Sequence, residues 1–193
     1  RNVTQVVHMR RELDPGREAF DPADSPLTVR SASEFSPELF ADTLLKTYDG
    51  SLDCPELTGT RTDREVLDGH RPALGLAADR FWHLARLGDE PAGVVLFDVG
   101  SEAGAMDLSY LGLVPAARGR GLGGDLVRLA VAHAAGEGHR TLTLSVDVRN
   151  EPAVRVYRRH GFWEYDRREV FLAAWPGPAR RRAGGSPSTR GRR

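Results

Sequence analysis

One stretch of the chain, residues 106–124, constrains the fold more than any other, because a strand pattern runs there directly into a glycine-rich helix start. The strand pattern has a period of two, with Met106, Leu108, Tyr110, Gly112 and Val114 on one face and Asp107, Ser109, Leu111 and Leu113 on the other. The loop after it contains Gly119, Gly121, Gly123 and Gly124, together with Arg118 and Arg120. Unpaired backbone N–H groups and the positive end of a helix dipole would face the same point. The stretch therefore predicts a binding site for an anion such as a phosphate.

The chain has 193 residues, which is enough for one well-buried domain and little more. Its hydrophobic content of 40% and charged content of 28% are ordinary for a soluble globular protein. No apolar run approaches the roughly 18 residues that a membrane span requires. The single cysteine, Cys54, excludes an internal disulfide and fits a reducing cytoplasm. We therefore expect a cytoplasmic protein without a membrane partner.

The neutral net charge conceals an uneven distribution along the sequence. The last 15 residues carry six arginines and no acidic residue, so the rest of the chain is net acidic. A tail of this composition cannot bury a core, and we expect it to be disordered and to have no specific nucleic-acid partner. The predicted division is an N-terminal extension or linker at 1–26, a folded domain at 27–176 and a disordered Arg-rich tail at 177–193.

Periodicity and capping residues predict the order β-α-α-β-β-β-α-β-α-β-β for the folded part. Helices are expected to begin at Ser36, Thr62 and Asn150, which are residue types that cap helix N-termini, and the last of these helices to end at Gly161. Strands are expected at 27–30, 81–87, 92–99, 106–114, 141–148, 162–165 and 169–175, and residues 1–13 are also compatible with a strand. The order predicts an α/β fold with helices packed on a mixed sheet.

The glycine loop also satisfies the dinucleotide-binding pattern G-x-G-x-x-G from Gly119 to Gly124, and Asp147 ends the next strand. Two observations argue against a dinucleotide-binding oxidoreductase. Residues 115–118 separate the strand from the first glycine, whereas the glycines of that fold follow the strand almost at once. Too little chain follows Asp147 for further β-α-β units. A Walker-type phosphate loop is excluded because no G-K-[ST] sequence is present.

A second set of motifs fits the same residues better. The sequence R-G-R-G-L-G at 118–123 resembles the R/Q-x-x-G-x-G/A signature of the GNAT superfamily of N-acetyltransferases. The segment from Asn150 to Phe162 resembles that family's N-x-x-A-x-x-x-Y-x-x-x-G-F pattern. The resemblance implies a mixed, mostly antiparallel sheet with central splayed parallel strands, flanked by helices. Residues 1–13 are then compatible with the last strand of a preceding domain, as in tandem members of the family, or with a simple extension.

The resemblance also implies a cofactor and the residues that bind it. Members of the family take acetyl-CoA as a co-substrate between the splayed strands. By similarity, the residues that bind it here are Leu113, Val114, Arg118, Gly119, Arg120, Gly121, Leu122, Gly123, Gly124 and Asn150. The first two would bond the pantetheine arm through their backbone, and the amides of 118–124 would surround the pyrophosphate. Tyr157 lies two helical turns after Asn150, and its phenol is suited to protonate the departing thiolate as a general acid.

The acceptor and the general base are less well determined. The resemblance implies acetyl transfer to a primary amine of a small molecule or a peptide, by direct transfer in a ternary complex. Asp107 is our candidate for the base or for an acceptor contact, because it lies on the strand face beside the expected acceptor cleft, with Tyr110 on the opposite face. Asp49, Asp53 and Glu56 form an acidic group in an irregular loop that would suit a cationic amine.

Other chemistry is not indicated by the sequence. The histidines show no H-E-x-x-H or comparable ligand spacing, so we predict no metal site. Cys54 has no positioned histidine near it in sequence, and we expect an ordinary loop or buried thiol rather than a nucleophile. Two non-enzymatic alternatives stay open: a domain that binds acyl-CoA as a sensor, and a degenerate half of a tandem protein. A homodimer is compatible with the sequence.

Overall fold

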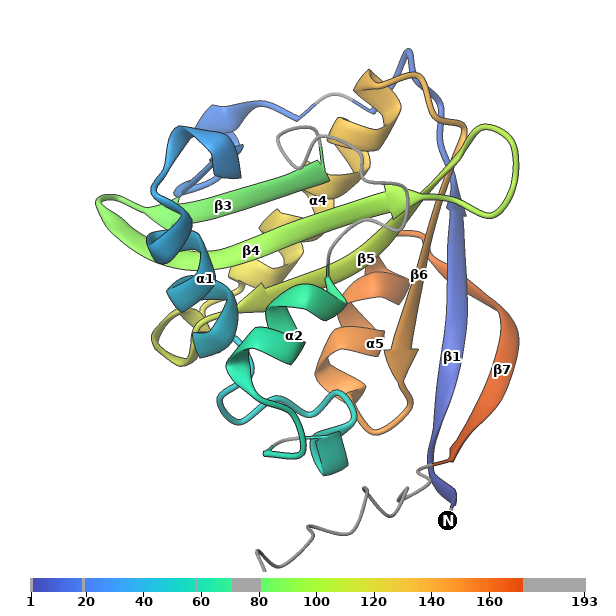
Figure 1. Cartoon of the computed structure of the whole chain (residues 1–193). Helices are drawn as coiled ribbons and strands as arrows, with labels where there is room; N and C mark the ends of the chain where they lie inside the picture. Colours follow the sequence, from blue (N-terminus) through green and yellow to red (C-terminus); the bar gives the residue numbers. More distant parts are fainter. Residues whose placement is uncertain (1, 19, 58, 71–80, 172–193) are drawn as a thin grey trace, which may run out of the picture.

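The strands in the described part of the computed structural model form one seven-stranded sheet in the order β2-β3-β4-β5-β6-β1-β7 (Figure 1). The structure describes residues 2–171 except 19, 58 and 71–80, so the predicted tail at 177–193 and the predicted domain end at 176 lie outside the described residues. The strands are β1 (Asn2–Glu12), β2 (Leu27–Ser31), β3 (Trp82–Leu87), β4 (Glu90–Val99), β5 (Ala105–Leu113), β6 (Thr141–Asp147) and β7 (Trp163–Phe171). The α-helices of this part are α1 (Pro37–Lys46), α2 (Asp63–Gly69), α4 (Leu122–Gly136) and α5 (Glu151–Arg159).

Neighbouring strands are antiparallel, except for β5 and β6, which run parallel. The prediction of a mixed, mostly antiparallel sheet with a central parallel pair is therefore confirmed. Helices α1 and α2 lie on one face of the sheet, which we call the α1 face (Figure 1). Helices α4 and α5 pack on the opposite face, the α4 face. None of the helices in the described ranges is long and apolar enough to cross a membrane.

Local capping interactions set the helix boundaries that the sequence predicted. The Ser36 hydroxyl accepts a hydrogen bond from the N–H of Leu39 at 3.2 Å. Thr62 and Glu65 form a reciprocal capping box at the start of α2. Gly161 has a φ of +80°, a conformation that favours glycine, and it turns the chain from α5 into β7.

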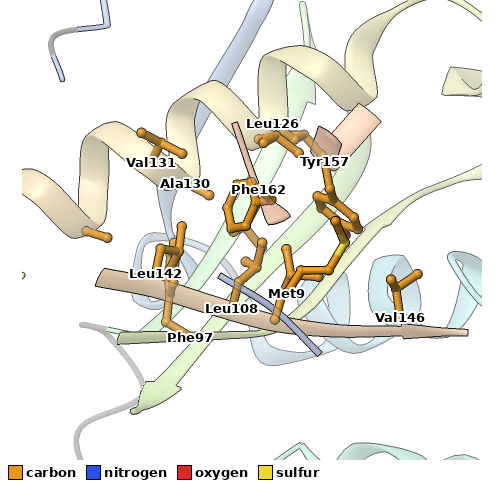
Figure 2. Close-up of a cluster of buried hydrophobic side chains, with 14 of the residues drawn as sticks. Met9, Phe97, Leu108, Leu126, Ala130, Val131, Leu142, Val146, Tyr157 and Phe162 are labelled. Atoms are coloured by element: carbon orange, nitrogen blue, oxygen red, sulfur yellow. The ribbon is translucent and has the colours of Figure 1, made fainter. Parts of the chain in front are cut away.

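Two apolar clusters hold the helices on the sheet. The larger one joins the sheet to α4 and α5, and its buried members include Met9, Leu126, Leu142, Leu144 and Phe162 (Figure 2). The smaller one joins α1 to β3 and β4 through Phe40, Leu44, Leu84, Val94 and Leu96. Full burial of each such side chain is worth about 1.5–3 kcal/mol. The clusters therefore fix the start of α4 and the side chains of α5 relative to the parallel strands.

Strand β1 lies inside the sheet, with β6 on one side and β7 on the other. Its Val7 and Met9 are buried in the larger cluster. This placement differs from the extension or linker that we expected at 1–26, outside the folded domain. The alternation of a strand is visible in the sequence, but it does not identify partners that lie more than a hundred residues away.

The end of the sheet also differs from the prediction. The two closing strands expected at 162–165 and 169–175 are instead one strand, β7, whose partner is β1. Residues 172–175 of the second expected strand lie outside the described residues. The charged residues between the two expected strands continue β7, because on an edge strand they are solvated and paired, as in the bridges from Arg167 to Glu164 and from Arg168 to Asp166, each 2.9 Å long.

A bulge in β5 changes which of its side chains share a face. Tyr110 lies opposite Leu96 of β4, whereas Asp107 lies opposite Asp98, so β5 holds one more residue than β4 over this interval. Tyr110 therefore packs on the α1 face, the face that Asp107 also takes. The prediction that Tyr110 lies on the face opposite Asp107 is wrong, because a period-two pattern does not reveal an inserted residue.

Candidate functional site

The parallel strands β5 and β6 separate after a short paired region. Only residues 105–108 pair with 141–144, although β5 continues to Leu113 and β6 to Asp147. Figure 1 shows the two strands diverging from there. We call the opening between the two unpaired strand ends the gap. Unpaired strand edges offer backbone donors and acceptors to an extended ligand.

The helix start that follows β5 has the geometry of an anion site. Gly119 and Gly121 have φ values of +72° and +82°, which favour glycine. Gly121 is the N-cap of α4, and no side chain caps the helix there. A Cβ atom added at either glycine would meet nothing within 4 Å, so the space around them is open. Uncapped amides, the helix dipole and open space fit a pyrophosphate.

Arg118 is used differently from the rest of this loop. Its guanidinium donates to the carbonyls of Leu113 at 3.0 Å, Thr47 at 2.8 Å and Asp49 at 2.6 Å. These bonds tie the glycine loop to the end of α1, and they occupy the side chain that we expected to add charge at a phosphate. Arg120 is exposed and makes no ion pair within the described ranges, so its charge is available to an anion.

The two backbone positions expected to bind the pantetheine arm are not equivalent. The N–H of Val114 donates to the carbonyl of Ala92, and its own carbonyl accepts from the N–H of Ala117, both at 2.9 Å. Both polar groups of Val114 are thus engaged within the chain. Because backbone groups alternate sides along a strand, those of Leu113 face the gap. Its carbonyl accepts from Arg118, which leaves its N–H as the donor toward the gap.

Asn150 occupies the predicted position at the start of α5. Its side-chain oxygen accepts a hydrogen bond from the N–H of Ala153 at 3.4 Å, and its own N–H donates to the carbonyl of Asp147. In the described part of the chain, the side-chain amide nitrogen has no protein acceptor. It can therefore donate to a ligand near the end of β6.

Tyr157 points from α5 into the layer between α4 and the sheet. Figure 2 shows its ring beside Met9 and Leu126, and its centroid lies 5.8 Å from that of Phe162. Burial raises the pKa of its hydroxyl above the usual value, and the Asp53 carboxylate raises it further. The phenol is therefore protonated throughout the physiological range. The same burial would raise the pKa of a thiolate beside it, which keeps proton delivery feasible.

Asp107 lies beside the closed end of the gap, where β5 and β6 are still paired. Its carboxylate accepts a hydrogen bond from the Thr143 hydroxyl at 2.7 Å. Burial raises the pKa of Asp107, and the bond from Thr143 opposes that shift. A carboxylate with a raised pKa is better suited than an ordinary one to take a proton from an ammonium group.

A loop is bonded to the end of β6, at the open end of the gap, and its contacts were not predictable from local sequence. Asp53 accepts a hydrogen bond through Oδ1 from the N–H of Asp147 at 2.7 Å. The N–H of Cys54 donates in return to Oδ2 of Asp147 at 3.1 Å. Cys54 has a φ of +46°, a strained conformation for a residue with a side chain, and these bonds hold it in place. The segment 51–57 is thereby fixed across the end of β6.

Asp147 is the centre of this attachment. It is fully buried, and it accepts hydrogen bonds from the Thr4 hydroxyl and from Arg149, each at 2.7 Å. Burial acts to raise the pKa of Asp147, but the hydrogen bonds outweigh it and lower the pKa to about 2. Arg149 also bonds both oxygens of Glu56, at 2.6 and 2.8 Å. Glu56 is thus paired, which weakens its expected part in an acidic group for a cationic acceptor.

The side chains of Asp53, Cys54 and Asp147 place three candidate ligand atoms within 4.8 Å of one another. Two properties make this donor set unsuited to a metal ion. Arg149 already neutralises Asp147. Burial and the neighbouring carboxylates raise the pKa of the Cys54 thiol to about 11, so the free thiol is protonated at neutral pH and a metal ion would have to displace that proton. We assign the cluster to loop attachment.

A cavity of about 450 Å³ opens on the α1 face between α1, α2 and the segment 51–57. Asp53, Tyr48 and Tyr110 are among its lining residues. The rings of Tyr48 and Tyr110 stack with centroids 5.3 Å apart and an interplanar angle of 10°. Their hydroxyls are hydrogen-bonded to His70 at 2.6 Å and to Thr47 at 2.8 Å, respectively. The inserted residue of β5 is what brings Tyr110 to this cavity.

The fold combines an uncapped helix start that can hold a phosphate with two parallel strands that separate beside it. Residues 45–162 match the sequence model of the acetyltransferase (GNAT) family. The chain belongs to this family.

Relatives and solved structures agree with that assignment. The chain is 39% identical over 83 residues to the mycothiol acetyltransferase of Streptomyces bingchenggensis, an alignment that covers 43% of this chain and 27% of that protein. It is 30% identical over 148 residues to the mycothiol acetyltransferase of Gordonia bronchialis, covering 67% and 47%. The crystal structure of a GCN5-related N-acetyltransferase from Sphaerobacter thermophilus is similar with a TM-score of 0.59 at 25% identity, covering 88% of this chain and 51% of that one. The chain thus spans about half or less of the length of these proteins.

Proposed function

We propose that this chain is an acetyl-CoA-dependent N-acetyltransferase that moves the acetyl group to a primary amine by direct transfer in a ternary complex. The observation that carries the proposal is the uncapped, glycine-rich start of α4, which follows the strand β5 that separates from β6. Gly119 and Gly121 take positive φ values in open space there, which leaves room for a pyrophosphate. Tyr157, the proposed proton donor, lies in the layer between α4 and the sheet (Figure 2).

In this proposal the start of α4 binds the pyrophosphate of acetyl-CoA. The backbone N–H groups of Gly119, Arg120, Gly121, Leu122 and Gly123 surround it, and the Arg120 side chain adds charge. The N–H of Gly124, which we also expected to take part, donates instead to the carbonyl of Gly121 at 3.0 Å. The N–H of Leu113 and the amide of Asn150 bind the pantetheine arm. Arg118 acts indirectly, since its guanidinium holds the loop in place, and Val114 fixes the end of β5 against β4.

The chemistry requires a neutral amine and a proton for the departing sulfur. Bound acetyl-CoA supplies the thioester. An alkyl ammonium with a pKa of about 10.4 is roughly 3 units too protonated at pH 7, which is a barrier of about 4 kcal/mol. Asp107, with its raised pKa, is the proposed base that takes the ammonium proton. Tyr157 holds the proton that the sulfur receives.

The proposed domain includes β1 as well as the residues from Leu27 onward, because β1 supplies part of the core beneath Tyr157. We propose a cytoplasmic location, which the single cysteine supports. The named relatives are mycothiol acetyltransferases, so a mycothiol-related amine is the first acceptor to test.

Calorimetric titration tests the cofactor, and thiol release in the presence of an amine panel tests the reaction. We expect acetyl-CoA to bind and NAD not to bind, and we expect thiol release to depend on an amine. Failure of acetyl-CoA to bind would contradict the proposal. Binding without thiol release for every amine would instead favour a sensor that binds acyl-CoA.

A further inference from the structure

We infer that Asp53 is the residue that binds the ammonium group of the acceptor, in the cavity on the α1 face, and orients it toward the gap. The inference rests on the proposed transferase function and deepens it. It assigns a substrate class to the cavity: compact primary amines that arrive as cations.

The first support is the geometry of the Asp53 carboxylate. Its Oδ1 atom is anchored by the N–H of Asp147 at 2.7 Å, so the group is held in one orientation at the open end of the gap. Its Oδ2 atom accepts no hydrogen bond from any described residue, and the side chain lines the cavity. A carboxylate with one fixed oxygen and one available oxygen is preorganised to accept a hydrogen bond from an ammonium group.

The second support is the wall of the cavity. The hydroxyls of Tyr48 and Tyr110 are hydrogen-bonded to His70 and Thr47, so the two stacked rings offer mainly their hydrocarbon surface. Aromatic rings attract a nearby cation and pack against the carbon skeleton that carries it. A volume of about 450 Å³ lies in the usual range for a small-molecule site.

The third support is the state of the other carboxylates near the gap. Glu56 and Asp147 are both paired with Arg149. Asp107 is bonded to Thr143 and is not among the residues that line the cavity, so an amine reaches it only after entering the gap. Asp53 therefore lies where a cation first meets the gap.

The remaining charged groups of the cavity do not replace Asp53. Asp49 and Asp63 line the same cavity but are exposed at its rim, where water screens their charge. Lys46 and Arg61 also line the cavity, so the charged residues around it include both signs. Burial raises the pKa of Asp53, and the bond from Asp147 opposes that shift. An ammonium partner would favour the ionised form.

The test compares Asp53→Asn with Asp49→Asn in the full chain saturated with CoA. The probes are ethanolamine and phenethylamine, with ethylene glycol and 2-phenylethanol as their uncharged counterparts, and binding is measured by calorimetry. Asparagine retains an oxygen for the N–H of Asp147, so the loop contact is preserved. Loss of a charge-assisted bond of about 1.5–3 kcal/mol should weaken amine binding about 10- to 150-fold in Asp53→Asn. The Asp49→Asn control should change it by less than about threefold.

Binding of the alcohols and of acetyl-CoA should be unchanged in both variants. Equal amine affinity in the two variants would overturn the inference and leave the proposed function intact, as would wild-type protein that binds acetyl-CoA but neither amine. Wild-type protein that does not bind acetyl-CoA would contradict the proposed function itself. If Asp53→Asn does not fold, the comparison within the wild type decides: amines must bind at least about tenfold more tightly than their alcohols, and equal binding would overturn the inference.

Discussion

The two sides of the gap are built in different ways. The proposed cofactor side consists of two stretches that are each continuous in sequence: one runs from the end of β5 through the glycine loop to the first turn of α4, and the other is the start of α5. The acceptor side is assembled from α1, α2, the segment 51–57 and the bulged part of β5, and it is fastened to the end of β6. This difference shows that a phosphate site built from backbone N–H groups can be predicted from a short stretch of sequence. A cavity for a second substrate cannot, because it depends on tertiary contacts.

Arg118 joins the two sides. It belongs to the glycine loop, but its guanidinium bonds the carbonyls of Thr47 and Asp49, which lie next to the cavity residue Tyr48. The sides can therefore be disturbed separately only by substitutions that leave this link intact. The following three variants keep it.

The largest effect is expected for Tyr157→Phe, which removes the proposed acid between the two sides. The turnover number should fall about 10²- to 10⁴-fold, the usual contribution of a positioned general acid. Affinity for acetyl-CoA and the melting temperature should stay the same, because the hydroxyl makes no hydrogen bond within the described residues. Tyr165→Phe, on the exposed part of β7, is the matched control and should retain full turnover. Turnover of Tyr157→Phe within threefold of the wild type would rule out the acid role.

Asp147→Asn should weaken the acceptor side while the cofactor side persists. A pKa lowered to about 2 from a usual value of about 3.8 corresponds to about 2 kcal/mol of folding stability, measured by urea unfolding at pH 7. The KM for the amine should also rise, since the segment 51–57 loses its anchor. Asp42→Asn, on the exposed surface of α1, should change stability by less than about 0.5 kcal/mol.

The Asp147→Asn variant also tests how the folding stability contributed by Asp147 depends on pH. Asp147 is ionised more readily in the folded than in the unfolded chain, so its contribution is complete above about pH 4 and is lost as the pH falls through about 2. The difference in stability between wild type and Asp147→Asn should shrink over that interval. A difference that is constant from pH 7 to pH 2 would contradict the ionic role of the side chain.

The smallest effect is expected for Gly121→Ala, which acts on the cofactor side alone. A left-handed φ costs a residue with a Cβ about 1–2 kcal/mol, so acetyl-CoA affinity should fall about 5- to 30-fold as the loop shifts. Gly136→Ala, at the other end of α4, adds the same methyl group to open space without a positive φ and should leave the affinity unchanged. Amine binding to the apoprotein should be equal in both variants, and an effect there would show that the sides are not separable.

Sequence reasoning recovered the features that depend on neighbouring residues. The caps at Ser36, Thr62 and Asn150 and the glycine turn into α4 follow from local propensity. The parallel pair was implied by the resemblance of the motifs to a known family. Site roles assigned from the motifs stay predictions until the variants are measured. The features that were missed depend on distant partners or on register.

Three residues show why these features could not be predicted from the local sequence. Arg118 is a plausible phosphate ligand in sequence, but its acceptors include the carbonyls of Thr47 and Asp49, which follow α1 and lie about seventy residues away. Tyr110 lies on the face of the sheet opposite to the predicted one, because β5 contains one inserted residue. The only sequence feature that pointed to Asp53 was the acidic residues near it. Its fixed position became visible only through the hydrogen bond from the N–H of Asp147, at the end of β6.

The position of β1 affects the order in which the chain folds during synthesis. Its two partners, β6 and β7, are translated long after it, so β1 is among the last of the described strands to find its neighbours. Until then Val7 and Met9 stay exposed to water, and the layer in which Tyr157 is buried stays incomplete. Formation of the proposed catalytic site therefore depends on a contact that spans almost the whole described chain. Such long-range closure is slow compared with local helix formation.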